Sequence, residues 1–439
     1  MAPLLLALGI FVLVLLATAL EWTHLSIAAL LGATAMLLLG ILSPPQAVAS
    51  LTSGGGTIAL LFGMMLVVRA LESSGAFNGL AHQLVQWSGG QGHRLLLGLV
   101  LLTVPVAAVL PNPSAVLLIA PLLPPLAREL NLDFRPLLIL MVLAANSASL
   151  LTLVGDPAVY IIGTGMGWNF LHYLQQITPV ALLMIGALLL TLPLLYRKIW
   201  RTKLPITTIK PRPAHHKEAL PWLLTVAALM LVLFITGDSL PIPLDPSAVA
   251  LGGAVATLFI SHHSGLRSVD QLLADIDWAT LIYFAAVFVL VGGLDRSGAL
   301  NSLASQMAQR VTGNLWASSM WLLLVSAALS ALIPNIPLVA ALTPLLLAAC
   351  RQGGLWTAGM PAEAAFPLFE ALMLGVVIGG SATVIGSSSN LVAAGVARQH
   401  QSRIGFRTWL GFGLPTVALQ LVVGWLYCWW SASGSTLQR

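Results

Sequence analysis

The sequence predicts an all-α integral membrane protein built from two inverted repeats, with about ten transmembrane helices plus two re-entrant hairpins with broken helices. Three observations predict this fold: an apolar composition, a series of long apolar runs and an internal repeat. Hydrophobic residues make up 58% of the 439 residues and charged residues only 8%, whereas soluble domains carry about 25% charged residues. The mean hydropathy is +0.95. Lipid is therefore the solvent that suits the outer surface of this chain.

Long apolar runs recur along the chain, each close to the roughly 20 residues that cross a hydrocarbon core of about 30 Å. No basic stretch precedes the first run and other runs follow directly, so we interpret it as a retained helix rather than a signal peptide. The predicted uninterrupted helices are 4–20, 25–42, 57–72 and 179–196 in the first half, and 219–236, 247–261, 279–294 and 409–430 in the second.

The two halves of the chain resemble each other at three places in the same order. A shift of 223 positions aligns two of these places, one of them with eight of fourteen residues identical, and a shift of 231 aligns the third. Because the matches include Asn, Gly, Pro and Thr, similarity between apolar segments does not explain them. The paired segments are 71–84 with 294–307, 111–123 with 334–346, and 152–155 with 383–386.

Each half also contains a stretch interrupted by Pro-Asn, followed by a long interrupted span. The Pro-Asn stretches are 96–126 and 317–350, and their arms of about 13–17 residues are short for a full crossing. Proline cannot continue a helix because it lacks the N–H, so each stretch is predicted to be a re-entrant hairpin. With the interrupted spans 136–163 and 367–397, each half makes five crossings. Repeats with an odd number of crossings must be inverted.

Basic residues indicate the orientation. Seven of the 19 Lys and Arg lie in 197–217, which is typical of a cytoplasmic loop and places both termini outside. Arg296, Arg310 and Arg351 depart from this pattern, because they fall in the outward segment around the second hairpin. The expected division is a first repeat at 1–196, a basic cytoplasmic linker at 197–218 and a second repeat at 219–439.

Small polar residues gather at the two hairpin tips and the two breaks. A broken helix at membrane depth leaves backbone groups that cost several kcal/mol each unless they are satisfied, and transporters use such breaks as binding sites. Any one of these residues also fits close helix packing, but four clusters at repeat-matched breaks favour a site. The predicted substrate-binding residues are Asn112, Ser114, Ser147, Ser149, Thr152, Asn335, Thr383, Ser387, Ser388, Ser389 and Asn390, with Asn146 and Ser381 in the same clusters; the predicted ion-coupling residues are Asp156, Asn112, Gly155, Asn335 and Gly386.

Asp156 is the most informative single residue. It lies between Gly155 and Pro157 in the first break, and its counterpart in the second half is Ser387. A carboxylate inside a membrane is costly and commonly serves as a proton or cation relay. The alternative is a carboxylate that caps a helix, and the two roles are compatible. Glu370 is a second candidate, but it lies about one turn inside its span and can instead reach the interface.

Other function classes find little support in the residues. HExxH, CxxC, GxSxG and Walker-type phosphate loops are all absent from the sequence, which argues against an enzyme or an ATP-driven pump. Cys350 and Cys428 have no metal or redox spacing. We therefore expect no metal site and no cofactor beyond Na⁺ or H⁺ as a coupling ion. The expected partners are a small-molecule or ion substrate and the lipid bilayer, with no nucleic acid.

The motifs resemble the ion transporter superfamily, within it the group of arsenite permeases, sodium/proton antiporters and P proteins. The matching segments are PNPSAVLLIAPLLPPL, TLVGDPAVYIIG, LIPNIPLVAALTPLL and GGSATVIGSSSNLVAAGVA, and the resemblance covers nearly the whole chain. It implies a homodimer, elevator-type alternating access and a place in the bacterial inner membrane. Relatives of this kind move arsenite, antimonite, Na⁺ against H⁺, silicic acid, or di- and tricarboxylates.

The chain departs from the family pattern at both tips, where Pro111 and Pro334 replace the usual Asp. This leaves Asp156 as the main titratable group and weakens a sodium/proton antiporter assignment. Because neither cysteine lies at a motif, an arsenite site would have to recognise As(OH)₃ by hydrogen bonds. We predict an arsenite-permease-like secondary transporter of a small inorganic solute or anion, coupled to an ion gradient. The alternative is a proton- or sodium-coupled symporter of a carboxylate or another anion, or a sodium/proton antiporter. A membrane-embedded enzyme or scaffold is a third, weaker alternative.

Overall fold

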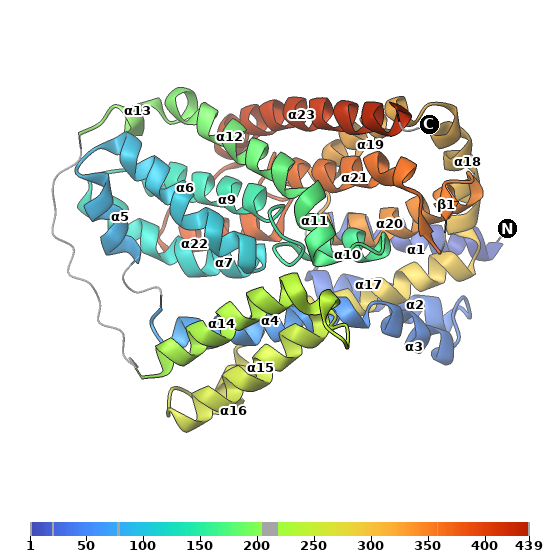
Figure 1. The fold of residues 1–439 in the computed structure, drawn as a ribbon, viewed down its shortest axis with the longest axis horizontal. Coiled ribbons are helices and arrows are strands. Elements are labelled where there is room, and N and C mark those ends of the chain that lie inside the picture. The colour runs from blue at the N-terminus through green and yellow to red at the C-terminus, as the bar shows by residue number, and fades with distance from the viewer. Residues whose placement is uncertain (1, 20–21, 77–79, 204–217, 358, 438–439) are drawn as a thin grey trace.

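The computed structural model describes the chain except residues 1, 20–21, 77–79, 204–217, 358 and 438–439. Its regular structure is helical apart from one antiparallel hairpin, in which β1 (Trp356–Thr357) pairs with β2 (Met360–Pro361) (Figure 1). The first half contains α1 (Ala2–Ala19), α2 (Leu25–Leu38), α3 (Pro44–Ser53), α4 (Gly55–Ser73), α5 (Leu80–Ser88), α6 (Gly92–Val109), α7 (Asn112–Ile119), η1 (Ala120–Leu122), α8 (Leu123–Glu129), α9 (Phe134–Ala148), α10 (Pro157–Gly165), α11 (Phe170–Gln176), α12 (Thr178–Leu195) and α13 (Arg197–Trp200). The second half contains α14 (Ala219–Thr236), η2 (Gly237–Ser239), α15 (Pro246–His263), α16 (Val269–Ala274), α17 (Trp278–Arg296), α18 (Ala299–Gly313), α19 (Leu315–Ser330), α20 (Asn335–Gln352), η3 (Glu363–Ala365), α21 (Phe366–Gly379), α22 (Ser388–Gln399) and α23 (Phe406–Leu437).

Apolar helices long enough to cross a bilayer occur in both halves of the fold. Seven helices among the described residues meet this condition: Gly55–Ser73, Gly92–Val109, Thr178–Leu195, Ala219–Ser239, Trp278–Arg296, Asn335–Gln352 and Phe406–Ser431. Four shorter apolar helices accompany them: Pro3–Thr18, Leu25–Leu38, Phe134–Ala148 and Leu315–Ser330. The predicted all-α membrane fold is confirmed. The short helices between these spans, such as α3, α5, α16 and α18, are additions that the hydropathy of the chain did not predict.

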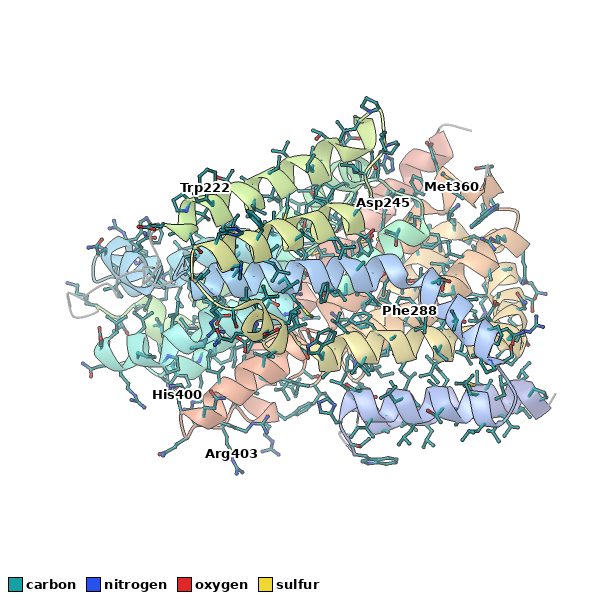
Figure 2. All side chains as sticks on the ribbon, turned by 90° about the horizontal axis from the view of Figure 1, so that it is seen from below. Trp222, Asp245, Phe288, Met360, His400 and Arg403 are labelled. Carbon is teal, nitrogen blue, oxygen red and sulfur yellow. The ribbon has the colours of Figure 1, made fainter. Side chains whose placement is uncertain are left out.

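The two halves run in opposite directions through the molecule. Both termini lie at one end of the long axis, whereas α13, which closes the first half, lies at the other end with the start of α14 (Figure 1). Arg403 lies in the half of the molecule that holds that end, whereas Met360 lies in the other half (Figure 2). Each half therefore crosses the molecule an odd number of times, as the inverted repeat requires. The centre of the basic linker, 204–217, lies outside the described residues.

Helix boundaries repeat with the same offsets as the sequence. Shifted by 223 positions, α4 has the bounds of α17, and the run from α7 to α8 (112–129) has the bounds of α20. Shifted by 231, α10 begins where α22 begins. Each hairpin turns at Pro-Asn, as predicted, and its returning helix starts at Asn112 or Asn335. One arm of each hairpin is longer than expected, because α6 and α20 have 18 residues each, whereas α19 has 16.

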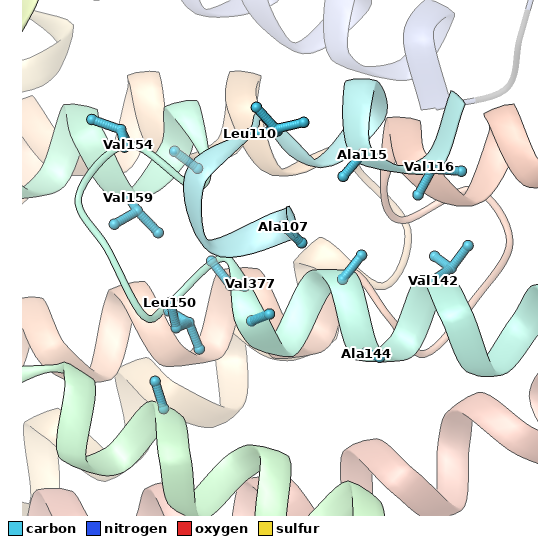
Figure 3. Packing of buried hydrophobic residues seen from close by; sticks show 14 of the residues in the cluster. Ala107, Leu110, Ala115, Val116, Val142, Ala144, Leu150, Val154, Val159 and Val377 are labelled. Carbon is cyan, nitrogen blue, oxygen red and sulfur yellow. The ribbon is translucent and has the colours of Figure 1, made fainter. Parts of the chain in front are cut away.

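The two breaks are stabilised in the same way. Thr152 Oγ1 donates to the Ala108 carbonyl, and Thr383 Oγ1 donates to the Ala331 carbonyl, at repeat-related positions. A Cβ on Gly155 would lie 2.7 Å from the Ser149 carbonyl oxygen, and one on Gly386 would lie 2.6 Å from that of Gly380. Apolar side chains of α6, α7, α9 and the first break pack around this turn (Figure 3). Only glycine fits where the broken backbone folds back on itself.

We expect Gly155→Ala and Gly386→Ala each to lower the free energy of unfolding by about 1–3 kcal/mol, because the added methyl group overlaps backbone oxygen. Gly395→Ala is the matched control, since a Cβ on this helical glycine of α22 would meet nothing within 4 Å. Thermal unfolding of the purified variants in detergent measures the difference. Equal stability of all three variants would mean that the breaks relax around a methyl group.

The orientation predicts which side of the membrane each end faces. Cysteines introduced at Pro3 and Trp430, both exposed near the termini, should react with an impermeant thiol reagent from outside the cell. A cysteine at Lys203, which is exposed and follows α13, should react only from the cytoplasmic side. The native Cys350 and Cys428 are buried and give a low background. Labelling of Lys203→Cys and Trp430→Cys from the same side would contradict the inverted repeat.

Candidate functional site

A cavity of about 420 Å³, called here the first cavity, lies where the two hairpin tips meet the two breaks. The tips contribute Pro111–Ser114 and Pro334–Pro337, and the breaks contribute Asp156 and Ser387–Ser389. Its other walls come from the turn between α1 and α2, from α4 and from the start of α17. Because α7 packs against α22 and α20 packs against α10, each tip lies beside the half-helix of the opposite repeat. Both repeats are therefore needed to form this cavity.

The Asp156 carboxylate makes the central polar contacts of the first cavity. Its Oδ1 accepts from the Ala158 N–H at 2.8 Å, so Asp156 caps α10, and its Oδ2 accepts from Asn112 Nδ2 at 3.0 Å. The residue is 4% exposed, and no basic side chain of the described residues forms an ion pair with it. Ser387, its counterpart, begins α22 without a side-chain cap. The site therefore carries its buried charge in one repeat only.

Asn335 brings the second tip to the same carboxylate. One atom of its amide lies 2.8 Å from Ser330 Oγ and 3.1 Å from the Gly386 carbonyl oxygen. Ser330 Oγ donates to the Val376 carbonyl, so this amide atom is surrounded by acceptors and is the nitrogen. The Asn335 side chain also contacts Asp156, and this assignment makes the remaining amide atom the oxygen. Oxygen atoms that face one another in this way favour a proton or a cation between them.

The first tip has a matching unsatisfied atom. Asn112 Oδ1 is buried and has no hydrogen-bond partner among the described residues, although Asn112 Nδ2 binds Asp156. Ser389 Oγ, which belongs to a residue that also lines the first cavity, is likewise buried without a described partner. Buried polar groups are normally hydrogen-bonded. These atoms are thus free to bind a solute or an ion.

Six of the predicted substrate-binding residues line the first cavity: Asn112, Ser114, Asn335, Ser387, Ser388 and Ser389. Five others, Ser147, Ser149, Thr152, Thr383 and Asn390, lie away from it and bind the surrounding structure. Asn390 Nδ2 donates to the carbonyls of Gly380 at 2.7 Å and Thr383 at 2.6 Å, and Asn146 Nδ2 donates to Asn390 Oδ1 at 3.1 Å. Ser147 Oγ accepts from Gln420 Nε2 at 2.8 Å. Gly155 and Gly386 are enclosed by backbone atoms.

Several residues of the first cavity were missed by the sequence reasoning. Arg69 and Glu72 line it from the end of α4 and form an ion pair at 2.9 Å, and Asp277 and Thr280 line it from the start of α17. His24 lies in the turn between α1 and α2. None of them belongs to a broken helix, so no local pattern marks them. Their role follows only from the packing of α4 and α17 against the tips.

A second cavity of about 890 Å³ lies at the opposite ends of the same two helices. Thr57 lines it from the start of α4, and Asp295 lines it from the end of α17, whereas the first cavity has the end of α4 and the start of α17. Helix α20 joins the two cavities, because Asn335 lines the first and Ala340 to Gln352 contribute to the second. Helix α20 therefore runs from the tip in the first cavity to the second cavity.

Glu370 does not line either cavity. It is 1% exposed in α21, and its Oε2 has no partner among the described residues, so it does not reach the interface as the sequence alternative allowed. In the part of the chain that the structure describes, no group of three or more His, Cys, Asp or Glu side chains could hold a metal ion.

Comparison with known proteins identifies the family and relatives of this chain. The family described as "Citrate transporter" (CitMHS) matches residues 11–368. The uncharacterized transporter slr0753 of Synechocystis sp. is 40% identical over 438 residues, covering 98% of this chain and 97% of that protein. The P protein of Homo sapiens is 27% identical over 489 residues, covering 93% of this chain and 57% of that protein.

Solved structures share the fold. The YdaH transporter of Alcanivorax borkumensis aligns with a TM-score of 0.63 at 17% identity, covering 98% of each chain. MtrF of Neisseria gonorrhoeae aligns with a TM-score of 0.54 at 14% identity, covering 98% of this chain and 94% of that one. The family resemblance predicted from the motifs is confirmed: this chain is a multi-pass membrane transporter that belongs to the CitMHS citrate transporter family.

Proposed function

We propose that the protein is a secondary active transporter that binds its solute in the first cavity, between Asn112 and Asn335, and couples its movement to a cation through Asp156. One observation carries this proposal: the amides of both hairpin tips adjoin a single buried carboxylate. The Ala158 N–H and Asn112 Nδ2 donate hydrogen bonds to Asp156, but neither group carries a charge that would neutralise it. A carboxylate held inside a membrane protein without a basic partner is a place for a proton or Na⁺.

The coupling ion is expected to bind among oxygen atoms. Asp156 offers its carboxylate, Asn112 offers its unpartnered Oδ1 and Asn335 offers its amide oxygen. Oxygen ligands suit a hard cation such as Na⁺, and the same cluster accepts a proton on Asp156. The ion would neutralise the site while the solute is bound, so that solute and ion move together.

Elevator-type alternating access is the movement that this arrangement supports. The tips and breaks pack on one another across the repeats, since α7 contacts α22 and α10 contacts α20. This unit faces α4 and α17, whose opposite ends contribute to the two cavities. Sliding of the unit along these two helices would expose the same tips first to one cavity and then to the other. The homodimer that the family resemblance implies would hold α4 and α17 in place during this movement.

Two solute classes fit the first cavity. A carboxylate of the citrate type is favoured by the family to which the chain belongs, and would rely on the coupling cation and on Arg69. Neutral As(OH)₃, the solute class first predicted, is favoured by the hydroxyl and amide groups at the tips. It is also favoured because Arg69, the one Lys or Arg among the described lining residues, is already paired with Glu72. Uptake of citrate, arsenite and antimonite into proteoliposomes distinguishes the two classes.

Asn112→Ala and Asn335→Ala are each expected to reduce transport at least tenfold, because each removes a donor and an acceptor from the site. Ser147→Ala is the matched control, since Ser147 is a buried polar residue that contacts α23 and lies outside the first cavity. Initial rates of solute uptake, normalised to protein in the membrane, measure the effect. Wild-type rates in both Asn variants would assign the tips a structural role alone.

Asp156→Asn separates the charge of this residue from its capping role. The amide oxygen of Asn still accepts from the Ala158 N–H, so we expect the fold and solute exchange at equal concentrations to survive. Accumulation of solute against its gradient should disappear, because an amide carries no proton or cation. Asp133→Asn is the control, since Asp133 caps α9 in the same way but is exposed and outside the cavities.

The two candidate ions give different results in the same vesicles. Accumulation driven by an imposed proton gradient indicates protonation of Asp156, whereas accumulation driven by a Na⁺ gradient indicates a bound Na⁺. If Asp156→Asn accumulates solute at the wild-type rate under both gradients, then Asp156 is a helix cap and the coupling proposal is wrong.

A further inference from the structure

We propose that the second cavity contains an anion-binding station, formed by Arg351 and Thr343, on the path to the tip at Asn335. This inference rests on the proposed function, because it assumes that solute reaches the tips from this side. The cavity lies toward the end of the molecule that carries the termini, as the positions of α3 and α18, which line it, show (Figure 1). It is larger than the first cavity, at about 890 Å³ against about 420 Å³.

Polar residues follow α20 from one cavity to the other. Asn335, Thr343 and Arg351 are spaced by eight residues, or about 12 Å along a helix at 1.5 Å per residue. Asn335 lines the first cavity, and Thr343 and Arg351 line the second. Thr343 is 2% exposed, and its Oγ1 has no hydrogen-bond partner among the described residues. A buried hydroxyl that lines a cavity without a protein partner is available to a ligand.

The contacts of Arg351 suit the binding of an anion. Its guanidinium carbon lies 4.1 Å from the centre of the Trp356 ring in β1, which is a cation–π contact. Among the described residues, no carboxylate forms an ion pair with it. A guanidinium edge matches a carboxylate or a similar oxyanion with two parallel hydrogen bonds. Arg351 is also one of the three arginines that depart from the cytoplasmic placement of the other basic residues. Binding of an anion would explain its position in an outward segment.

Asp295 is a negatively charged residue of the second cavity, and its charge opposes the binding of an anion there. It lines the second cavity from α17 and lies beyond ion-pair distance of Arg351. Its repeat counterpart is Glu72, which pairs with Arg69 one turn earlier in α4; the position one turn before Asp295 is Gly292. Asp295 therefore keeps a negative charge that weakens anion binding in this cavity. If instead Asp295 and Arg351 formed a closing ion pair, the loss of either charge would have the same effect.

Thiol labelling of Thr164→Cys tests the station without requiring transport. Thr164 is exposed in α10 and lines the second cavity, and the background has Cys350 and Cys428 replaced by alanine. We measure the ratio of labelling rates by an anionic and a cationic methanethiosulfonate. Arg351→Gln should lower this ratio roughly threefold or more, and Asp295→Asn should raise it, because the charges of a cavity set the local concentration of ions. Arg128→Gln, at the repeat counterpart of Arg351 but outside both cavities, should leave it unchanged.

Citrate serves as the probe for binding. It should slow labelling of Thr164→Cys by an uncharged thiol reagent, and Arg351→Gln or Thr343→Val should abolish this protection. Absence of protection by citrate, or protection that survives Arg351→Gln, overturns the station. A change of the labelling ratio in the same direction in Arg351→Gln and Asp295→Asn overturns it in favour of a closing ion pair. Asn112→Ala separates this proposal from the proposed function. If it abolishes uptake but leaves the labelling of Thr164→Cys and its protection by citrate unchanged, then the defect lies in the first cavity and the station is intact.

Discussion

The need to satisfy broken backbone inside a membrane governs this structure. Each half contains eight residues that lie outside regular helix, 149–156 and 380–387, between the two helices of an interrupted span. In hydrocarbon each unpaired N–H or C=O costs several kcal/mol, so these segments need partners from the protein itself. The hydroxyls of Thr152 and Thr383 bind the end of the preceding hairpin arm, and the Asn390 amide binds two carbonyls of the second break. The hairpins, in turn, have their tips fixed beside the breaks.

This constraint explains how far the sequence could predict the molecule. Hydropathy, proline and the internal repeat define helices, tips and breaks, because each depends on local composition or on similarity within the chain. The same information could not divide the polar residues of the breaks into those that stabilise backbone and those that face the first cavity. Thr383 and Ser387 are both small, polar and close in sequence, yet the first binds Ala331 and the second lines the cavity. Only the folded positions of their neighbours make the distinction.

Residues from unbroken helices were harder still to predict. Asp277 and Glu72 lie at ordinary helix ends, where a charged residue normally caps a helix or faces the interface. Asp277 does cap α17, since its side chain accepts from the Thr280 N–H. Its place in the wall of the first cavity follows from the packing of α4 and α17 against the tips. A pattern along one segment carries no information about such a contact between distant segments.

Comparison of the two repeats distinguishes positions that are alike in both halves from positions that differ. Positions that are alike in both halves, such as Gly155 with Gly386, maintain the breaks. Two charged residues that line the first cavity have uncharged counterparts: Asp156 corresponds to Ser387, and Arg69 corresponds to Gly292. Perfect symmetry would make the two directions of movement equivalent and would place a charge in both breaks. Under the proposed function, the single buried carboxylate, which accepts one hydrogen bond from the first tip, would need only one cation to neutralise it. Under the proposed function, the unit that carries the tips can then pass the apolar side chains of α4 and α17 only when Asp156 is neutral, because an uncompensated carboxylate is too costly there. The coupling of solute to ion would thus follow from the difference between the two halves, and the similarity between them would supply the two matching positions at which the unit rests.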